Sequence, residues 1–424
     1  MNLSISELPY LESTNNLLSN LSELGNLCGL ESANGDHENG RWSIITAAPF
    51  KTICKNAMGI DDWKEVESLM KILPHVESDL PFTGGVIGHV NYSASSEESP
   101  KSVFYNLYTW AFILDHLTKK THLIYWNELS TISQGELKDR YNSDICSSHC
   151  FLMTSSFKPL WSRNTYNKKI HTIHNYILSG DAYQINLTQK FSGEYQGNPL
   201  EAYKRLKSQS NSPFLSYFES KDRILASASP EQFIECKGGI VSTKPIKGTI
   251  PRSHNKDVDL NNMQSLQNSS KDQAENLMIT DLLRNDLAKN CTNIKVPKLF
   301  SIESFETVHH LVTTITAEKP KQISAFKVFQ DAFPGGSITG TPKKRAMEII
   351  SELEDFSRDL YCGCSFLYSS NGKFNSNILI RSFVFENNKV HCWAGGAITI
   401  DSTAEGEYQE SLDKISRLMS TLEN

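Results

Sequence analysis

The sequence predicts a large α+β protein whose strands are joined mainly by antiparallel connections. Short alternating segments of strand length recur along the chain, the pair Gly238-Gly239 forms a hairpin turn between two of them, and several amphipathic segments are long enough for helices. Because 424 residues exceed the ~250–300 that one simple core usually serves, we expect two lobes or one large layered body.

Residues 1–155 mix short apolar stretches with breaks rich in Asn, Ser and Gly, which is typical of strands joined by loops. We expect strands at 82–90, 105–114 and 121–126, where aromatic and β-branched residues are concentrated. The pattern changes near residue 160. We therefore predict an N-terminal region (1–155) and a second region (160–424) that interleave into one compact body.

The second region mixes strands and helices. Residues 165–178 carry apolar side chains at helical spacing and end before Gly180, whereas residues 183–191 alternate with a period of two. The other expected elements are strands at 223–228, 232–236, 240–243, 377–385 and 390–393, helices at 273–289, 342–353 and 404–422, and a polar loop at 253–271.

Composition argues against several classes of protein. The 42 Lys and Arg residues against 48 Asp and Glu give a net charge of -6 without a basic stripe, so we expect no nucleic-acid partner. Apolar runs are only a few residues long and the start lacks a leader pattern, so we expect no membrane segment and a cytoplasmic protein. Nine scattered cysteines without C-x-x-C spacing predict reduced, mostly buried thiols.

An acid and an amine lie sixteen residues apart across the predicted hairpin. Glu231 follows Ser229-Pro, and Lys247 lies between Ile246 and Gly248. Two neighbouring strands can direct both side chains into one cavity, where partial desolvation favours the neutral, nucleophilic amine and the carboxyl serves as general acid or base. The alternative is a solvated lysine and an exposed turn glutamate.

A glycine-rich loop, Pro334-Gly-Gly-Ser337-Ile-Thr-Gly-Thr341, runs directly into the predicted helix that begins at Pro342. Thr341 can cap this helix, Pro342 suits its first position, and free N–H groups at a helix start bind anions. The Gly-Lys-Ser/Thr of a phosphate-binding P-loop is absent. The loop predicts a carboxylate site, with a simple tight turn as the alternative.

Isolated charged residues complete the candidate site. Glu275 on the 273–289 helix is a candidate oxygen ligand, since Mg²⁺ takes two or three carboxylates with waters. Arg381 interrupts an apolar predicted strand and requires an anionic partner if it is buried. Glu407, Glu410 and Lys414 share one face of the last helix, where periodicity alone favours a solvated surface with an i,i+4 ion pair.

Taken in order, these segments resemble the chorismate-utilising enzymes from about residue 165 to the end. The motifs that carry the resemblance are Ser-Pro-Glu231, Pro-Ile-Lys247-Gly-Thr249, Ala-Glu275-Asn-Leu-Met, Asp281-Leu-Leu-Arg-Asn-Asp286, His309-His310-Leu-Val, Pro334-Gly-Gly-Ser-Ile-Thr-Gly, Ile-Arg381-Ser, Ala394-Gly-Gly and Glu407-Tyr-Gln-Glu410. Their joint occurrence makes the match specific. The resemblance implies a layered α/β sandwich of two large, mainly antiparallel sheets with outer helices, as in anthranilate synthase component I, rather than a doubly wound sheet.

In the family that these segments resemble, the residue at position 247 largely selects the branch. Pro-Ile-Lys247-Gly-Thr resembles the aminodeoxychorismate synthase branch, whereas the anthranilate synthase branch generally has Ala there. The resemblance implies that Lys247 attacks chorismate at C2, that Glu231 protonates the departing C4 hydroxyl, and that ammonia then displaces the lysine. The product would be 4-amino-4-deoxychorismate, on the route to 4-aminobenzoate and folate.

The resemblance also implies roles for the remaining site residues. Mg²⁺ would be bound by Glu275 and Glu410, with Glu407 close to it. The residues expected to bind chorismate are Arg381, Gly395, Gly396 and Lys414 at a carboxylate, and Thr249, His310, Ser337 and Tyr361 along the pocket. Ala397 departs from the family pattern, which usually has Gly there.

Two further expectations follow from the resemblance. The segments Leu30-Glu31-Ser32 and Ser212-Pro213-Phe214 are similar to those that hold tryptophan in the anthranilate synthase branch. None of the nine cysteines lies in a Gly-x-Cys-x-Gly setting, so ammonia would come from a separate glutaminase (glutamine amidotransferase) subunit or from solution. The alternative functions are an anthranilate synthase component I and a catalytically silent protein that binds chorismate or tryptophan.

Overall fold

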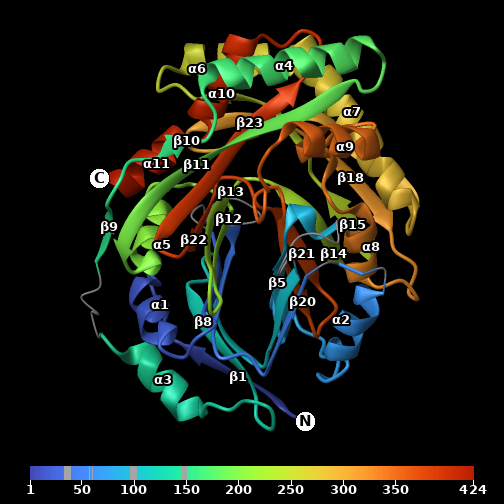
Figure 1. Cartoon of the computed structure of the whole chain (residues 1–424). Helices are drawn as coiled ribbons and strands as arrows, with labels where there is room; N and C mark the ends of the chain where they lie inside the picture. Colours follow the sequence, from blue (N-terminus) through green and yellow to red (C-terminus); the bar gives the residue numbers. More distant parts are fainter. Residues whose placement is uncertain (33–39, 57, 60, 96–102, 145–149) are drawn as a thin grey trace.

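The fold consists of two large antiparallel β-sheets that lie face to face, with helices on their outer sides (Figure 1). The structure is a computed structural model, and it describes residues 1–32, 40–56, 58–59, 61–95, 103–144 and 150–424. Its paired strands run antiparallel, which confirms the predicted α+β sandwich.

The first sheet has thirteen strands within the described residues. In spatial order they are β1 (Leu3–Leu8), β8 (Lys120–Trp126), β7 (Trp110–Asp115), β3 (Trp42–Thr46), β2 (Cys28–Glu31), β12 (Phe214–Glu219), β13 (Ile224–Ser229), β22 (Ser382–Glu386), β23 (Lys389–Ile398), β11 (Gln184–Gly197) and β10 (Lys158–Pro159), and β19 (Gly340–Thr341) and β9 (Phe151–Met153) also pair with β11. The sheet thus combines strands from both regions of the sequence.

The second sheet has ten strands within the same residues and is also mixed in origin. In spatial order they are β16 (Ile246–Pro251), β18 (Val308–Glu318), β15 (Ile240–Thr243), β14 (Gln232–Lys237), β21 (Phe374–Ile378), β20 (Cys364–Ser369), β5 (Gly85–Val90), β6 (Val103–Tyr108) and β4 (Lys51–Lys55), and β17 (Thr292–Ser304) pairs with β18.

Helices cover the outer faces and the top of the sandwich in Figure 1. They are α1 (Asn15–Ser22), α3 (Gln134–Asn142), α5 (Pro199–Ser208) and α11 (Ser416–Glu423) beside the first sheet, α2 (Asp62–Met70), α7 (Ser270–Ala288) and α8 (Ala325–Ala332) beside the second, and α4 (Arg163–Leu178), α6 (Lys256–Gln267) and α10 (Ala404–Asp413) at the top. α9 (Lys343–Leu353) packs on β11 and β19 of the first sheet. Short 3-10 helices occur at η2 (Tyr92–Ser95) and η3 (Gly336–Ile338). No helix in the described ranges is long and apolar enough to cross a membrane.

The largest hydrophobic core combines residues of both sheets with residues of α2, α7 and α8, and a second cluster fills the space under α1, α5 and α11. β7 is buried along its whole length, which explains its continuous apolar sequence, because a strand covered on both faces does not alternate. A third cluster lies under α4 and α9. Six of the eight described cysteines are buried and all eight are free; Cys146 lies outside the described residues.

Two predicted strands are in fact pairs of strands in different sheets. The segment 105–114 divides at Thr109 into β6 and β7, and the segment 377–385 divides at 379–381 into β21 and β22. Each predicted strand was wrong in the same way, because an apolar run that is buried throughout contains no signal for the point where the chain changes sheets. The sheet change at 379–381 determines the position of Arg381.

The structure also differs from the prediction at three helical segments. The polar segment 253–271 contains α6, which has a single buried side chain, Leu266, so its hydrophobic pattern is weak; Asn255 caps its first turn instead. The predicted last helix is divided into α10 and α11. Thr341 does not cap α9: it lies in β19, and Pro342 occupies the cap position without a side-chain bond.

Candidate active site

Glu231 lies in the bend between β13 and β14, and its side chain is buried rather than exposed in a turn. Burial raises the pKa of its carboxyl to about 7. A hydrogen bond from Ser337, the charges of Lys247 and Lys414 and a hydrogen bond from the backbone N–H of Ile246 offset part of that rise, because each stabilises the ionised form. A carboxyl that titrates near neutrality is suited to proton transfer.

Lys247 belongs to β16, which pairs with β18 and is separated from β14 by two strands. The expectation that Glu231 and Lys247 lie on neighbouring strands is therefore wrong, although the start of β16 still reaches Glu231 through Ile246. The Lys247 Nζ atom lies 3.7 Å from Oε2 of Glu275, and the two side chains are only 13% and 12% exposed. A largely buried primary amine thus lies beside two carboxyl groups.

Glycine at position 248 permits this arrangement. Gly248 has φ of +81°, and a Cβ there would lie 2.8 Å from side-chain atoms of Asp272 and Leu266. Only glycine combines this backbone conformation with such close approach. The residue after Lys247 therefore lets β16 lie directly against α6 and α7.

Thr249 and His310 lie opposite each other on β16 and β18. The Thr249 hydroxyl and His310 Nδ1 are 2.8 Å apart, and the His310 ring packs edge-on against Phe305 at 5.1 Å between centroids. The structure therefore places both predicted pocket residues on the sheet edge that carries Lys247.

The glycine-rich loop is packed tightly between α7 and β21. A Cβ at Gly336 would lie 2.5 Å from Leu282, and one at Gly335 would lie 3.0 Å from Ile378. Lys343, at the start of α9, forms an ion pair with buried Asp286 of α7 and donates to the carbonyl of Ala332 at 2.9 Å. These contacts fix the loop so that Ser337 reaches Glu231.

Arg381 lies where the chain crosses from the second sheet to the first, in a bend with φ of +53° rather than inside a strand. Its backbone carbonyl accepts a hydrogen bond from the N–H of Ala228. Its guanidinium has no hydrogen-bond or ion-pair partner among the described residues, and burial lowers its pKa. An enclosed, unpaired guanidinium is suited to receive a carboxylate.

Glu407 and Glu410 project from α10 toward the backbone of Gly396. Glu407 is buried, Oε1 accepts a hydrogen bond from the Ser402 hydroxyl at 2.6 Å, and Oε2 has no partner among the described residues. Burial and the nearby charge of Glu410 raise the pKa of Glu407. The predicted solvated surface is therefore wrong for Glu407.

Glu410 is more exposed and lies among lysines. Burial opposes its ionisation, but Lys414, Lys247 and Lys271 together lower its pKa. The Lys414 ammonium lies 2.6 Å from Glu410 and donates to the carbonyl of Gly395 at 2.9 Å. The predicted i,i+4 pair is present, and it is anchored to the strand that carries the two glycines.

The three predicted metal ligands form two adjacent groups. Glu275 lies beside Lys247 and Lys271, and both lysines also act on Glu410, whereas no three acidic, His or Cys side chains within the described ranges form one metal-sized cluster. The unpartnered Oε2 of Glu407 and the space left by the missing Cβ of Gly396, which would lie 2.7 Å from that oxygen, fit a hard cation. Lys271 was missed from the sequence, although it lies one helical turn before Glu275.

The remaining pocket residues lie along β23 and the turn before β20. Gly395 pairs with Thr188 on β11, and a Cβ on it would lie 2.0 Å from the carbonyl oxygen of Leu187. Ala397, the departure from the family pattern, lies opposite Asn186. Tyr361 is buried and stacks on Trp393 with centroids 6.1 Å apart, and burial raises the pKa of its hydroxyl well above the usual value.

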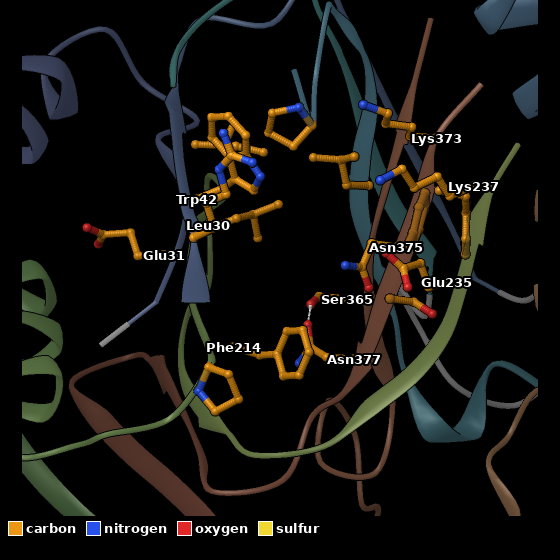
Figure 2. Close-up of a pocket in the computed structure, with 18 of the residues that line it drawn as sticks. Leu30, Glu31, Trp42, Phe214, Glu235, Lys237, Ser365, Lys373, Asn375 and Asn377 are labelled. Carbon is orange, nitrogen blue, oxygen red and sulfur yellow. Dashed lines mark hydrogen bonds between the residues drawn. The ribbon is translucent and has the colours of Figure 1, made fainter. Parts of the chain in front are cut away.

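A separate cavity of about 480 Å³ lies between the two sheets (Figure 2). Its walls include Leu30, Glu31, Pro213 and Phe214 of the predicted tryptophan site; Ser32 follows directly after β2.

Figure 2 shows the Glu31 carboxylate directed away from this cavity. It accepts hydrogen bonds from Lys207 at 2.6 Å and Tyr203 at 2.8 Å, and also from Thr14. Lysine side chains of the second sheet, Lys237 and Lys373, line the opposite wall. Apolar side chains such as Phe366 and Phe374 also line it, and Arg41 lies on the side of the first sheet, so the cavity has mixed apolar and charged walls.

The fold and this set of side chains define an enzyme class, and comparison with known proteins identifies it. The chain belongs to the family described as chorismate binding enzyme, whose match covers residues 30–420. This confirms the family predicted from the motifs.

Individual relatives extend over nearly the whole chain. Aminodeoxychorismate synthase component 1 of Salmonella typhimurium is 36% identical, covering 93% of this chain and 92% of its own. Anthranilate synthase component 1 of Lactococcus lactis is 29% identical, covering 92% and 93%. The crystal structure of anthranilate synthase component I from Streptococcus pneumoniae matches with a TM-score of 0.77 at 27% identity, covering 91% of this chain and 93% of its own.

Proposed function

We propose that the chain is the chorismate-converting subunit of an aminodeoxychorismate synthase, which replaces the C4 hydroxyl of chorismate with an amino group. The observation that carries this proposal is the buried Lys247 amine close to Glu231, a carboxyl that can hold a proton near neutral pH. The identity to aminodeoxychorismate synthase component 1 supports the same branch.

The proposed reaction has two displacements. In the first, the neutral Lys247 amine forms a bond to C2, the ring double bonds shift, and the C4 hydroxyl leaves as water with the proton of Glu231. In the second, ammonia forms a bond to C4, the double bonds shift back, and the Lys247 amine is released. Chorismate and ammonia thus give 4-amino-4-deoxychorismate and water without an oxidant or reductant.

The two chorismate carboxylates would be bound by the unpaired guanidinium of Arg381 and by the backbone of Gly395 and Gly396. We assign Arg381 to one carboxylate, because its guanidinium lacks a partner within the described part of the chain. We assign the backbone of Gly395 and Gly396 to a carboxylate as well, because the missing Cβ of Gly396 leaves space beside Glu407 and Glu410, and Lys414 donates to the carbonyl of Gly395. Thr249, His310, Ser337 and Tyr361 would line the remaining walls.

Mg²⁺ is the cofactor that we assign to Glu275 and Glu410, with Glu407 adjacent. When bound, Mg²⁺ would neutralise a substrate carboxylate and hold it in the pocket. The carboxylate oxygens on α7 and α10 have the chemistry that this ion prefers.

Ammonia would be supplied by a separate glutaminase subunit or from solution.

Tryptophan is the ligand that we assign to the inter-sheet cavity. The mixed apolar and charged walls of this cavity suit a molecule with an apolar ring and a charged end. A cytoplasmic location stays a prediction.

The test is to incubate the pure protein with chorismate, MgCl2 and ammonium chloride at mildly alkaline pH and to identify the product by mass spectrometry. We expect aminodeoxychorismate, converted to 4-aminobenzoate only when a lyase is added. Anthranilate would instead identify the anthranilate synthase branch. Absence of any product with ammonia and with an added glutaminase subunit would favour a silent binding protein.

A further inference from the structure

A buried ion pair outside the residues assigned above connects the segments that form the active site. The Arg358 guanidinium donates through Nε and Nη2 to the two carboxylate oxygens of Glu354, each at 2.7 Å, and the two side chains are 1% and 3% exposed. Glu354 also accepts hydrogen bonds from the backbone N–H and the hydroxyl of Thr188, at 3.0 and 2.8 Å. The pair is therefore fixed on both sides.

The remaining donors of Arg358 reach two backbone carbonyls. Nη1 donates to the carbonyl of Ile338 at 2.8 Å, one residue after Ser337, and Nη2 donates to the carbonyl of Asn186 at 2.6 Å, opposite Ala397 on β23. The carbonyl of Arg358 itself accepts from the N–H of Tyr361 at 3.0 Å. One guanidinium thus connects the glycine-rich loop, the strand pair β11–β23 and the turn that carries Tyr361.

Stability alone does not explain this arrangement. A buried ion pair loses much of its attraction to desolvation and is often replaceable by apolar side chains. A planar fork with five donors, however, is the one side chain that can hold a carboxylate and two separate carbonyls at once, and lysine cannot do so. The Cζ atom of Arg358 lies over the Tyr92 ring, 4.7 Å from its centroid, and this cation–π contact further fixes the plane of the guanidinium.

We propose that Arg358, oriented by Glu354, is a positioning residue for Glu231: it holds the loop at Ile338 so that the Ser337 hydroxyl donates to the Glu231 carboxylate. This inference rests on the proposed function, in which Glu231 is the general acid. Arg358 does not touch the reacting atoms in this scheme; it acts through Ser337.

The electrostatic surroundings of Glu231 predict the sign of the effect. The charged and titratable groups that face it are Lys247 from β16, Lys414 after α10 and the Cys364 thiol from β20, besides the hydrogen bonds of Ser337 and Ile246. Since the Ser337 hydroxyl stabilises the ionised carboxylate, loss of that bond should make Glu231 retain its proton to higher pH. The bond to a charged group corresponds to a shift of about one pH unit.

The experiment compares Arg358→Lys, Ser337→Ala and the double variant. We expect each single variant to move the alkaline limb of kcat/KM for chorismate, measured at a fixed concentration of free ammonia, upward by about one pH unit. In the double variant the shift should be no larger than in Ser337→Ala alone, because both changes remove the same bond. Additive shifts, or a lower kcat/KM with an unmoved limb, would overturn the proposal.

Arg41→Lys is the matched control. Arg41 donates two hydrogen bonds, of 3.0 and 2.7 Å, to the buried carboxylate of Asp115, as Arg358 does to Glu354. Unlike Arg358, it lies at the inter-sheet cavity. The Arg41→Lys variant should have a lower thermal stability but an unchanged alkaline limb of kcat/KM for chorismate. If Arg358→Lys does not fold, Glu354→Gln, which releases the fork while keeping Arg358, answers the same question.

A second measurement separates failure of this inference from failure of the proposed function. Infrared titration of the chorismate-free protein reports the protonated carboxyl of Glu231 directly, with Glu231→Gln identifying its band. A shift of this band in Arg358→Lys would support the positioning role even if the wild-type protein made no aminodeoxychorismate. An unshifted band in an active enzyme would overturn the positioning role alone.

Discussion

Lys247 is the residue on which the proposed chemistry most directly depends. We expect Lys247→Ala to lower aminodeoxychorismate formation by a factor of about 10³ or more, because its amine is the nucleophile of the proposed first displacement. Chorismate binding should persist, since Arg381 and the glycine backbone are untouched. Product formation measured by mass spectrometry and chorismate binding measured by calorimetry check the two parts.

Lys244→Ala is the matched control, three residues earlier in the chain. Lys244 pairs with Glu303 at 3.5 Å and its side chain is 17% exposed, so its burial is similar to that of Lys247. Its removal should leave turnover nearly unchanged. Equal turnover of the Lys247→Ala and wild-type proteins would remove the covalent lysine from the mechanism.

Glu231 gives the reaction a defined pH dependence. Burial raises the pKa of its carboxyl to about 7, so the protonated form needed by a general acid is abundant below that pH and is lost above it. At a constant concentration of free ammonia, kcat/KM for chorismate should therefore fall as pH rises through about 7. Glu231→Gln should lower the rate and abolish this limb; an identical limb in that variant would assign the titration to another group.

At the scale of elements, local signals in the sequence predicted only part of the structure, and the helices α1, α2, α3, α5 and α8 and the strands β17 and β18 were not predicted. The Gly238-Gly239 turn fixed the strand Ile240–Thr243 correctly, and helical spacing located α4 and α9 to within two residues. α6 was missed because it buries one side chain and depends on its Asn255 cap and on contact with β16. Hydrophobic periodicity in a sequence arises where one face of a helix is buried against a neighbour. Because α6 buries almost none of its side chains, its sequence lacks this periodicity.

The candidate site was predictable as a set of residues but not as a geometry. The motif order identified Glu231, Lys247 and Arg381, whereas the sheet change that places Arg381 depends on strand pairing between distant segments. The burial of Glu407 was likewise invisible, because its partner Ser402 lies before the helix and the glycine that faces it lies on another strand. Such long-range contacts leave no trace in local periodicity.

α10 carries the prediction that concerns metal binding. Glu407→Gln removes a buried, partly unsatisfied carboxylate, so the variant should be at least as stable as the wild type without metal. Millimolar MgCl2 should raise the Tm of the wild type and have a smaller effect on the variant. Thermal denaturation with and without MgCl2 measures both.

Glu405→Gln provides the control for this prediction. Glu405 lies on the same helix, is exposed and pairs with Arg163. Its Mg²⁺-dependent shift in Tm should equal that of the wild type. Equal Mg²⁺ shifts in Glu407→Gln and the wild type would remove Glu407 from the metal site.

At the scale of the whole molecule, the inter-sheet cavity is the feature that can connect a ligand to overall stability. Its walls come from both sheets, so a bound ligand contacts both at once. We expect tryptophan to raise the Tm of the protein by several degrees at saturating concentration, and Leu30→Trp, which fills the cavity from β2, to abolish this shift. Leu30→Trp should still convert chorismate.

Thermal denaturation with L-tryptophan, and with D-tryptophan as the control ligand, tests this prediction. A shift that survives Leu30→Trp would place the ligand elsewhere. A wild-type Tm that does not respond to tryptophan would leave the cavity as a structural feature of this chain.

The mixed origin of both sheets has a consequence for how the chain folds. β2 pairs with β12, and β13 pairs with β22, so strands near the middle of the first sheet find their neighbours only after most of the chain exists. Closing loops of this length before native contacts form makes folding slow, and a chain emerging from the ribosome exposes unpaired strand edges until its C-terminal third has been synthesised. We therefore expect that neither half acquires a stable structure when produced alone, and that heat inactivates the protein in one cooperative step.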